Sequence, residues 1–491
     1  MVFLDKRIYT LAYLYLLIPN ICFLLGFIKC EIGIPLTIFL AVAFVKIVKN
    51  SENLDLRIKK NKLLIVFLII IVWCAVSGIG GFIWQNRWDH KFRNAIFVDL
   101  VNYSWPVVNS DNGLCYYLGF WLPSALAGKV CGLQIGYAFQ LLWAIVGVCI
   151  LYFLISKYIG KFNIKNIIIL ILFSGLDVVI YFLYHNMSLM DYAYLILQGL
   201  HLELGATFFN SSSNTTLLFW LYNQIIPFWV GMMLIILQGK RKNIGFIYAN
   251  MLLFAPFPSV ALLPVVIYIM IKDERSIKAS NLKKIKECVN FENLVALLLA
   301  VMVFLFFKSN GAANKISILE LNFKSIFKYL TYMFFEFGVW LLFVYKENYK
   351  DKILNILLIC QLFLPFIVMG DSYDFAWRTC IPLSYYIMLL VMKKLGQPEG
   401  RRLKRYALIA VLCMGSITPI SEIMRTAIHE YHVIEGTETA RSESLSSIFD
   451  KENNECYINF TGDTESIFYK FSNCSGPLFR PTPDICAKQR K

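Results

Sequence analysis

Apolar segments of about twenty residues recur along almost the whole chain, and this repetition limits the folds that the chain can adopt. A helix needs roughly 20 residues to cross the hydrocarbon core of a bilayer. Open sheet edges cannot be satisfied in lipid, and the sequence lacks the alternating pattern of a transmembrane barrel. We therefore predict an all-α membrane protein. The predicted single spans are 9–28, 33–48, 63–83, 133–155, 166–184, 215–237, 290–307, 327–345, 353–369, 379–392 and 406–420.

The composition agrees with a membrane protein, because only 16% of the 491 residues are charged, whereas soluble domains contain about 25% charged residues. The net charge of +15 would also suit a nucleic-acid-binding protein. The lysines and arginines, however, lie in short loops between the predicted spans, where they serve as orientation signals. We therefore expect no nucleic-acid partner. The first apolar run has no small-residue cleavage site, so we interpret it as a span rather than a signal peptide.

Segment 244–271 is too long for one simple span, and Pro256, Pro258 and Pro264 interrupt it. Basic residues flank the segment on both sides, which requires an even number of crossings. We therefore predict a hairpin or a re-entrant pair. Helices broken by proline are tolerated at membrane depth where they are buried in protein or line a cavity.

The basic loops then fall on one side of the bilayer, which the positive-inside rule identifies as cytoplasmic. These loops are 49–62, 157–165, 239–243, 272–286, 346–352 and 393–405. The result is about 13 transmembrane helices, with the N-terminus in the cytoplasm and the C-terminus outside. The richness in Ile, Lys and Asn is typical of an AT-rich bacterial genome, so we expect a multi-pass protein of a bacterial plasma membrane.

We predict two domains, a polytopic transmembrane domain over 1–420 and a small extracytoplasmic tail over 421–491. The tail is polar and carries three cysteines, of which two can pair outside the cytoplasm, although the sequence does not specify the partners. These cysteines are Cys456, Cys474 and Cys486.

Outer loop 84–132 carries an unusual charge cluster beside a membrane span. Its members lie within seven positions and are Arg87, Asp89, His90, Lys91 and Arg93. Charge is costly near hydrocarbon, so such a cluster is a candidate functional site. In the functional interpretation, a carboxylate base is flanked by cations that hold an anionic substrate. The alternative is a solvated interfacial helix with local ion pairs.

Segment 116–132 follows in the same loop and is apolar, aromatic and too short to span. It is typical of an interfacial helix that lies on the outer leaflet. The alternative is a loop that packs on the helical bundle.

Asp374 and Arg378 form a second candidate site at the outer mouth of a span, where their i, i+4 spacing allows an ion pair on one helix face. An arginine at this depth suits bidentate phosphate binding. The same pair can instead cap and anchor the helix end.

His201 and Glu203 lie in outer loop 185–214, which contains no lysine or arginine and leads into a span with Asn223 and Gln224. Buried amides in a span need partners or a polar cavity. The loop can bind sugar hydroxyl groups, or it can simply cap the helix that follows. His201 and Glu203 can also ligate a metal, although two ligands are a weak signal.

Three sequence blocks resemble bacterial polytopic envelope proteins of the glycosyltransferase type. They are Asp89-His90-Lys91 with Asn94-Ala-Ile and Trp105-Pro-Val, Ser213 to Trp220 with Asn223-Gln224, and Asp374-Phe-x-x-Arg378 with Ile381-Pro382. Over about 60–420 the chain resembles the GT-C class of integral-membrane glycosyltransferases. This resemblance implies a catalytic carboxylate in the first large outer loop and a sugar donor linked to polyprenyl phosphate. The catalytic role then falls on Asp89, although here the loop follows the third predicted span and requires an added N-terminal hairpin.

The expected activity is transfer of a sugar from polyprenyl phosphate to an envelope glycan, lipid or protein acceptor on the outer face. Asp89 would act as the general base, with His90 in reserve. The cations expected to bind the substrate phosphate are Arg93, Lys91, Arg378 and Arg87. The other residues expected to contact substrate are Asp374, Asn223, Gln224, His201 and Glu203.

Membrane lipids are the other expected partner, and no cofactor is certain, although a divalent metal ion is compatible with the sequence. Three alternatives remain open. The first is a polysaccharide polymerase or ligase that uses a lipid diphosphate donor. The second is a transporter, for which Glu336 is the nearest ionisable residue inside a span. The third is a non-catalytic scaffold.

Overall fold

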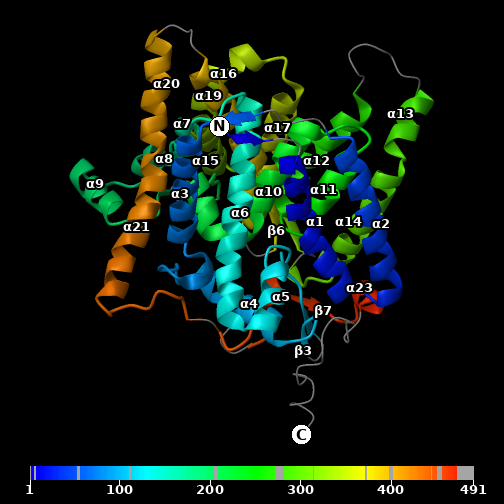
Figure 1. The fold of residues 1–491 in the computed structure, drawn as a ribbon. Helices are drawn as coiled ribbons and strands as arrows, with labels where there is room; N and C mark the ends of the chain where they lie inside the picture. The colour runs from blue at the N-terminus through cyan, green and yellow to red at the C-terminus, as the bar shows by residue number, and fades with distance from the viewer. Residues whose placement is uncertain are drawn as a thin grey trace.

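The fold is given by a computed structural model, which we describe for a set of residue ranges that covers most of the chain. These ranges are 2–4, 7–51, 56–109, 112–203, 208–272, 281–312, 315–370, 373–397, 402–443, 445–450 and 456–472. Most of these residues are helical, and the strands have only two or three residues each (Figure 1). Cys474 and Cys486 lie outside the described ranges, so the predicted tail disulfide stays a prediction.

The elements follow one another along the chain without any long strand. Up to residue 238 they are β1 (Val2–Leu4), α1 (Arg7–Phe27), α2 (Cys30–Lys49), β2 (Leu56–Ile58), α3 (Lys60–Val76), η1 (Ile79–Gly81), α4 (Asp89–Asn102), β3 (Val108–Asn109), β4 (Asn112–Leu114), α5 (Leu122–Cys131), α6 (Leu133–Ile159), α7 (Ile164–Leu172), α8 (Asp177–Tyr184), α9 (Leu189–Leu197) and α10 (Asn214–Gln238). Beyond it they are α11 (Ile244–Leu252), α12 (Pro256–Ile271), α13 (Asn281–Cys288), α14 (Phe291–Lys308), β5 (Ile316–Ile318), α15 (Phe323–Tyr332), η4 (Met333–Gly338), α16 (Val339–Asn348), α17 (Lys352–Phe363), η5 (Leu364–Phe366), β6 (Ile367–Met369), α18 (Asp374–Thr379), α19 (Ile381–Gly396), α20 (Arg402–Gly415), α21 (Ile417–Ile434), α22 (Tyr457–Phe460), β7 (Thr461–Asp463) and α23 (Ile467–Phe471).

Within the described ranges, nine helical segments are long and apolar enough to cross a membrane. They are Arg7–Phe27, Cys30–Lys49, Leu133–Ile159, Ile164–Tyr184, Asn214–Gln238, Phe291–Lys308, Phe323–Asn348, Asp374–Gly396 and Arg402–Ile434. Two shorter apolar helices, Pro256–Ile271 and Lys352–Phe366, accompany them. The prediction of a helical membrane protein is confirmed at this level, whereas the count of about 13 crossings stays a prediction.

Helix α10 runs through the centre of the bundle, where 78% of its apolar window is buried, compared with 28% for the peripheral helix α2. Its Trp229 ring stacks on Tyr385 of α19 at 5.9 Å and lies 6.5 Å from Trp73 of α3. A helix that is apolar on all sides is expected in the interior of a bundle or facing lipid. The peripheral helices instead leave apolar side chains exposed, as helices that face lipid do.

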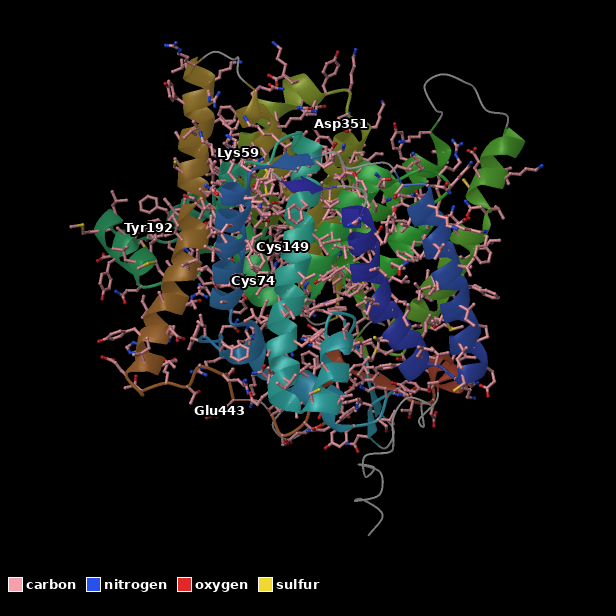
Figure 2. All side chains as sticks on the ribbon, viewed as in Figure 1. Lys59, Cys74, Cys149, Tyr192, Asp351 and Glu443 are labelled. Atoms are coloured by element: carbon pink, nitrogen blue, oxygen red, sulfur yellow. The ribbon has the colours of Figure 1, made fainter. Side chains whose placement is uncertain are left out.

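The connecting segments gather at two ends of the bundle (Figure 1). At one end, which we call the basic end, β1 pairs with β2 and Tyr386 donates a hydrogen bond to Asp351 at 2.6 Å. At the other, the tail end, β3, β4 and β7 form an antiparallel sheet that joins loop 84–132 to residues 461–463. Figure 2 places Lys59 and Asp351 at the first end and Glu443 at the second.

The broken segment 244–271 leaves the basic end and returns to it. Arg241 precedes α11, yet its Nε donates a hydrogen bond to Met270 O at 2.7 Å at the end of α12. Both flanks therefore lie at one end, as a hairpin or a re-entrant pair requires. The break falls at residues 253–255, between the two helices. Just beyond it, Phe257 packs against Tyr117 and Phe375, with ring centroids 5.8 and 5.4 Å apart.

Three predicted boundaries differ from the structure. Helix α3 ends at Val76, because Gly78, Gly80 and Gly81 have positive φ angles of 78, 82 and 70° and turn the chain. In segment 116–132 only Leu122–Cys131 is helical, and its flank packs on the bundle with Phe120 and Trp121 fully buried.

The predicted domain boundary near Ser421 lies inside helix α21, which continues to Ile434. Polar residues extend this helix because the bundle supplies partners for them. Ser421, for example, donates a hydrogen bond to Leu200 O at 2.8 Å.

Candidate functional site

Helix α4 begins at Asp89 and places Arg93 one turn later. The Asn86 side chain accepts a hydrogen bond from the Asp89 backbone N–H at 3.0 Å, which fixes the first turn. Arg93 Nη2 lies 2.8 Å from Asp89 Oδ2 in an i, i+4 ion pair. A carboxylate in the first turn is also stabilised by the positive end of the helix dipole.

Helix α18 repeats this arrangement at the entrance to α19. Arg378 Nη1 lies 2.9 Å from Asp374 Oδ2, again with i, i+4 spacing. In both pairs the arginine is the buried partner. The side chains of Arg93 and Arg378 are 4% and 9% exposed, whereas those of Asp89 and Asp374 are 30% and 38% exposed.

The two pairs come together in space although they are distant in sequence. The charges of Asp374 and Arg378 both act on the Asp89 carboxyl group. Both arginines and both carboxylates act on the hydroxyl group of Tyr116, which precedes α5. We call this group of residues, Asp89, Arg93, Asp374 and Arg378, the arginine–carboxylate site. The sequence predicted the Asp374–Arg378 pair and a charge cluster around Asp89, and in the structure the two pairs lie close enough for their charges to interact.

The surroundings of the site change the acidity of its groups. Burial raises the pKa of Asp89, and this effect outweighs the opposing charge of Arg93. Burial also raises the pKa of Tyr116 to about 12 and that of Tyr117 further. Asp89 is thus reachable by solvent and yet largely surrounded by protein. Its carboxylate is a stronger base than that of an ordinary aspartate.

Each arginine has a further nitrogen besides the one that pairs with its carboxylate. Arg93 Nη1 and Arg378 Nε are buried, and neither has an acceptor within hydrogen-bond distance among the described residues. Burying such a donor without a partner is unfavourable. Guanidinium groups of this kind suit carboxylate or phosphate oxygens. The Arg93 guanidinium also lies 5.5 Å from the centre of the Tyr222 ring, which fixes its position.

His90, the reserve base, is fully buried on α4. Its Nε2 lies 3.1 Å from Phe219 O, and its ring stacks on Tyr222 at 5.8 Å. Burial, with the charge of Arg93, lowers the pKa of His90 to about 3, so the ring is neutral. Helix α10 is kinked at Leu221, which has φ −134° and ψ 24°. The position of His90 suits a residue that binds the Phe219 carbonyl group near this kink.

Asn223 and Gln224 lie just after this kink. Asn223 Nδ2 donates a weak hydrogen bond to Tyr117 O at 3.4 Å, which ties α10 to the segment beside the site. Gln224 is 2% exposed, and neither of its amide atoms has a partner among the described residues. Asn223 therefore borders the site from inside the bundle, and Gln224 adds a buried amide one residue further along α10.

His201 lies near Asp89, and its charge acts on the Asp89 carboxyl group. Its Nδ1 is 3.7 Å from Glu422 Oε2 and 3.3 Å from Arg425 Nη2. Burial lowers the pKa of His201, but Glu422 and Glu203 raise it by more, so the net pKa is above its usual value. Glu203 Oε1 accepts a hydrogen bond from Ser213 N at 2.9 Å.

His201 and Glu203 are thus occupied by protein partners. In the part of the chain that the structure describes, no group of three or more His, Cys, Asp or Glu residues is arranged to hold a metal ion. The suggested metal ion therefore gains no support from this arrangement.

Arg87 and Lys91 lie apart from the buried arginines. They line an open cavity of about 860 Å³ together with residues of the tail, among them Glu438 and Glu443. Arg87 Nη2 donates a hydrogen bond to Thr439 O at 2.6 Å and lies 3.2 Å from Glu438 Oε2. The Arg87 guanidinium therefore holds the tail against the start of α4.

Sequence reasoning missed the tyrosines and the α21 residues beside the site. Tyr116 and Tyr117 carried no signal beyond membership of a short apolar segment. Glu422 and Arg425 do have i, i+3 spacing, a sequence signal that falls just after predicted span 406–420. Glu422 Oε1 also accepts a hydrogen bond from Trp220 Nε1 at 2.7 Å.

No protein-family model, curated protein or solved structure matches this chain.

Proposed function

We propose that the chain is an integral-membrane glycosyltransferase that moves a sugar from a polyprenyl-phosphate donor to a cell-envelope acceptor. One observation carries this proposal, namely that the Asp89–Arg93 and Asp374–Arg378 pairs meet at the tail end of a membrane bundle. Transfer from a lipid phosphate requires a base for the acceptor and fixed positive charge for the leaving group. The arginine–carboxylate site supplies both.

In this mechanism the acceptor oxygen attacks the anomeric carbon of the sugar while Asp89 removes the hydroxyl proton. The bond from the anomeric carbon to the phosphate oxygen breaks, and the electron pair stays on that oxygen. Arg93 Nη1 and Arg378 Nε then donate hydrogen bonds to the developing phosphate charge. The products are a new glycosidic bond and free polyprenyl phosphate. A positioned base of this kind contributes about 10²–10⁴-fold to the rate.

The walls of the site suit a donor with a lipid chain. Tyr117 and the re-entrant residue Phe257 form an apolar surface beside Arg378. Phe257 lies just after the break between α11 and α12, so this break places the apolar surface beside the site and inside the bundle. The lipid chain of the donor would follow the re-entrant pair while its phosphate group faces the arginines.

The test uses membranes that contain the native protein or a variant and a panel of labelled polyprenyl-phosphate sugars. The native protein should transfer label from one donor, and Asp89→Asn should abolish transfer while membrane insertion is unchanged. Asp191→Asn, on α9 and outside the site, is the matched control and should transfer normally. Full activity in Asp89→Asn would remove Asp89 as the base. Label transfer only from lipid diphosphate donors would favour a polymerase or ligase instead.

A transporter is the second candidate, and one observation favours it. Three carboxylates lie buried inside the bundle, because Glu336, Asp177 and Glu203 are each 3% exposed and the charges of Asp177 and Glu203 act on Glu336. Ionisable residues at membrane depth often mark ion or proton pathways. Glu336→Gln separates the two candidates, since it should leave sugar transfer intact and should abolish proton-coupled uptake by proteoliposomes.

A further inference from the structure

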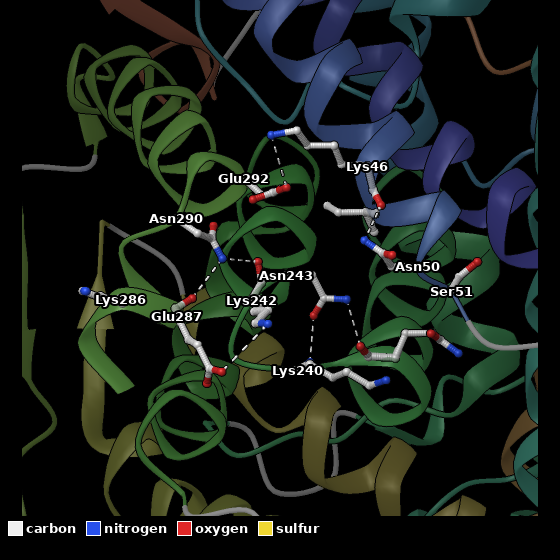
Figure 3. Close-up of a pocket in the computed structure, with 12 residues that line it drawn as sticks. Lys46, Asn50, Ser51, Lys240, Lys242, Asn243, Lys286, Glu287, Asn290 and Glu292 are labelled. Atoms are coloured by element: carbon white, nitrogen blue, oxygen red, sulfur yellow. Dashed lines mark hydrogen bonds and ion pairs between the residues drawn. The ribbon is translucent and has the colours of Figure 1, made fainter. Parts of the chain in front are cut away.

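Two carboxyl groups inside the bundle differ from the acidic side chains at the basic end, because they have no cation partner among the described residues. In the pocket shown in Figure 3, Glu292 Oε1 lies 3.9 Å from Lys46 Nζ. Asp177 of α8 and Glu336 of the π-helix η4 are instead each 3% exposed. Neither forms an ion pair with a lysine, arginine or histidine of the described ranges. Unpaired charge at such a depth is unfavourable, so this carboxyl pair needs a physical explanation.

Three interruptions of helical structure meet at these two carboxyl groups. The span that contains α7 and α8 is broken over residues 173–176, directly before Asp177. The span that contains α15 and α16 widens between them into the π-helix that carries Glu336. The span that contains α20 and α21 is interrupted at Ser416. Helix α8 packs against both η4 and α20. Interrupted helices and π-helical turns at membrane depth often mark functional sites.

Close backbone contacts hold the three interruptions together. Leu176 N donates a hydrogen bond to Phe335 O at 3.2 Å, which joins the break before α8 to the π-helix. Gly175 faces the Glu336 carboxyl group so closely that a Cβ atom on residue 175 would overlap it. At the end of α20, a Cβ atom on Gly415 would lie 3.0 Å from the Gly175 carbonyl oxygen. The joint of the three spans therefore has room for the Glu336 side chain because residue 175 is a glycine.

The two carboxyl groups differ in the hydrogen-bond donors that reach them. Asp177 Oδ2 accepts hydrogen bonds from Ser174 Oγ at 2.8 Å and from Thr418 Oγ1 at 3.3 Å. Neither oxygen of Glu336 has such a donor among the described residues. The two carboxyl groups nevertheless lie within hydrogen-bond reach of each other, and two carboxyl groups can bond only if one of them carries a proton. Because donors stabilise the ionised form, Asp177 is the carboxylate and Glu336 is the acid that donates to it.

The groups around Glu336 supply no positive charge. The titratable groups that act on Glu336 are Asp177, Glu203 and Cys380, and Tyr332 is in turn affected by the charge of Glu336. All of these groups are acids, so none of them can neutralise a Glu336 carboxylate. A buried carboxylate without a cation is so unfavourable that it takes up a proton instead.

We propose that Asp177 and Glu336 form a proton-binding site inside the membrane, in which Glu336 holds one proton and donates it in a hydrogen bond to Asp177. The ligand is a proton because the two carboxyl groups face each other directly and Gly175 closes the space beside Glu336. The inference does not depend on sugar transfer, since it concerns residues outside the arginine–carboxylate site. Its test contains no sugar donor and can therefore fail while the glycosyltransferase proposal holds.

The test records infrared spectra of the full-length protein in lipid vesicles at neutral pH, where the C=O stretch of a protonated carboxyl group forms a separate band. The difference between the native protein and Glu336→Gln should contain this band, because the variant removes the protonated group. Asp177→Asn should keep the band and move it to higher frequency, since an amide oxygen is a weaker acceptor than a carboxylate. Native protein made with heavy-carbon glutamate should show the band at lower frequency, a measurement that needs no substitution.

The matched control is Glu347→Gln, which makes the same change in the same span at a side chain that is 53% exposed. This control should leave the band in place. A native spectrum in which heavy-carbon glutamate moves no such band would overturn the proposal, because no glutamate would then carry a proton. A band that is lost in Asp177→Asn but kept in Glu336→Gln would also overturn it, because the proton would then lie on Asp177.

Discussion

At the basic end, lysine ammonium groups are exposed at the surface, whereas at the tail end two guanidinium groups lie almost fully buried beside carboxylates. Lys46 and Lys242 have side-chain exposures of 51% and 70%, against 4% for Arg93 and 9% for Arg378. Exposed charge is largely solvated and costs little, but buried charge is tolerated only when it is paired. The basic end therefore carries solvated charge, whereas the tail end holds buried charge that its carboxylate partners stabilise.

The largest expected difference between the two ends is in sugar transfer. Asp89→Asn removes the base and should lower the transfer rate by at least about a hundredfold. Lys161→Gln, at the basic end, should leave the rate unchanged. Initial rates with saturating donor measure both variants. Comparable losses of transfer rate in the two variants would contradict the difference between the two ends.

The second difference is in stability. Arg93→Leu leaves the Asp89 carboxylate without its partner in a desolvated position and should lower the free energy of unfolding by about 2 kcal/mol, less than for a fully buried pair because Asp89 is partly exposed. The double variant Asp89→Asn/Arg93→Leu should regain part of this loss. Denaturant unfolding in micelles measures both, and Lys161→Gln serves as the control. If the double variant is less stable than Arg93→Leu alone, the pair is not the cause.

Asp99 should make the stability of the tail end depend on pH. It lies fully buried on α4, and burial raises its pKa from 3.8 to about 6 despite hydrogen bonds from Ile448 N and Ser447 Oγ. Between these pH values the folded protein binds more protons than the unfolded chain, so stability falls as the pH rises. This loss amounts to at most about 3 kcal/mol.

Asp99→Asn should remove this pH dependence and stabilise the protein above pH 6, because a neutral amide oxygen can accept the same hydrogen bonds. Melting temperatures from pH 4 to pH 7.5 give the measurement. An unchanged pH profile in the variant would assign the effect to other groups.

The smallest expected effect concerns the tail contact. Glu438→Gln weakens a partly exposed cluster in which Glu438 Oε2 accepts a hydrogen bond from Trp84 Nε1 at 2.8 Å and pairs with Arg87. Exposed pairs of this kind contribute about 0.2–1 kcal/mol. The variant should melt almost normally but be cleaved faster by protease near residues 437–443. Equal cleavage rates would mean that other contacts hold the tail.

The sequence was sufficient for the helices, because apolar length and basic flanks identify spans directly. It also indicated that segment 244–271 returns to the end that it leaves, since Pro256, Pro258 and Pro264 break a segment with two basic flanks. The i, i+4 spacing predicted the Asp374–Arg378 pair, a local property of a helix, and the Asp89–Arg93 pair has the same spacing within the charge cluster that the sequence identified.

The proximity of the two ion pairs could not be predicted from the sequence, because no spacing rule links two helices so distant in sequence. Likewise, the place of Glu422 beside His201 depends on how α21 packs against loop 185–214, which is a tertiary property. The same reason applies to Arg87, which lies two residues before Asp89 in sequence but contacts the tail in space.

The β4–β7 pairing has a consequence for folding. Asn112 pairs with Asp463, and Leu114 pairs with Thr461, so one small sheet joins two segments that lie far apart in the chain. Contacts between such distant segments form slowly, because the long intervening loop must first be closed. Local helices such as α4 can therefore form before this sheet is complete, and the sheet closes only when residues 461–463 dock on loop 84–132.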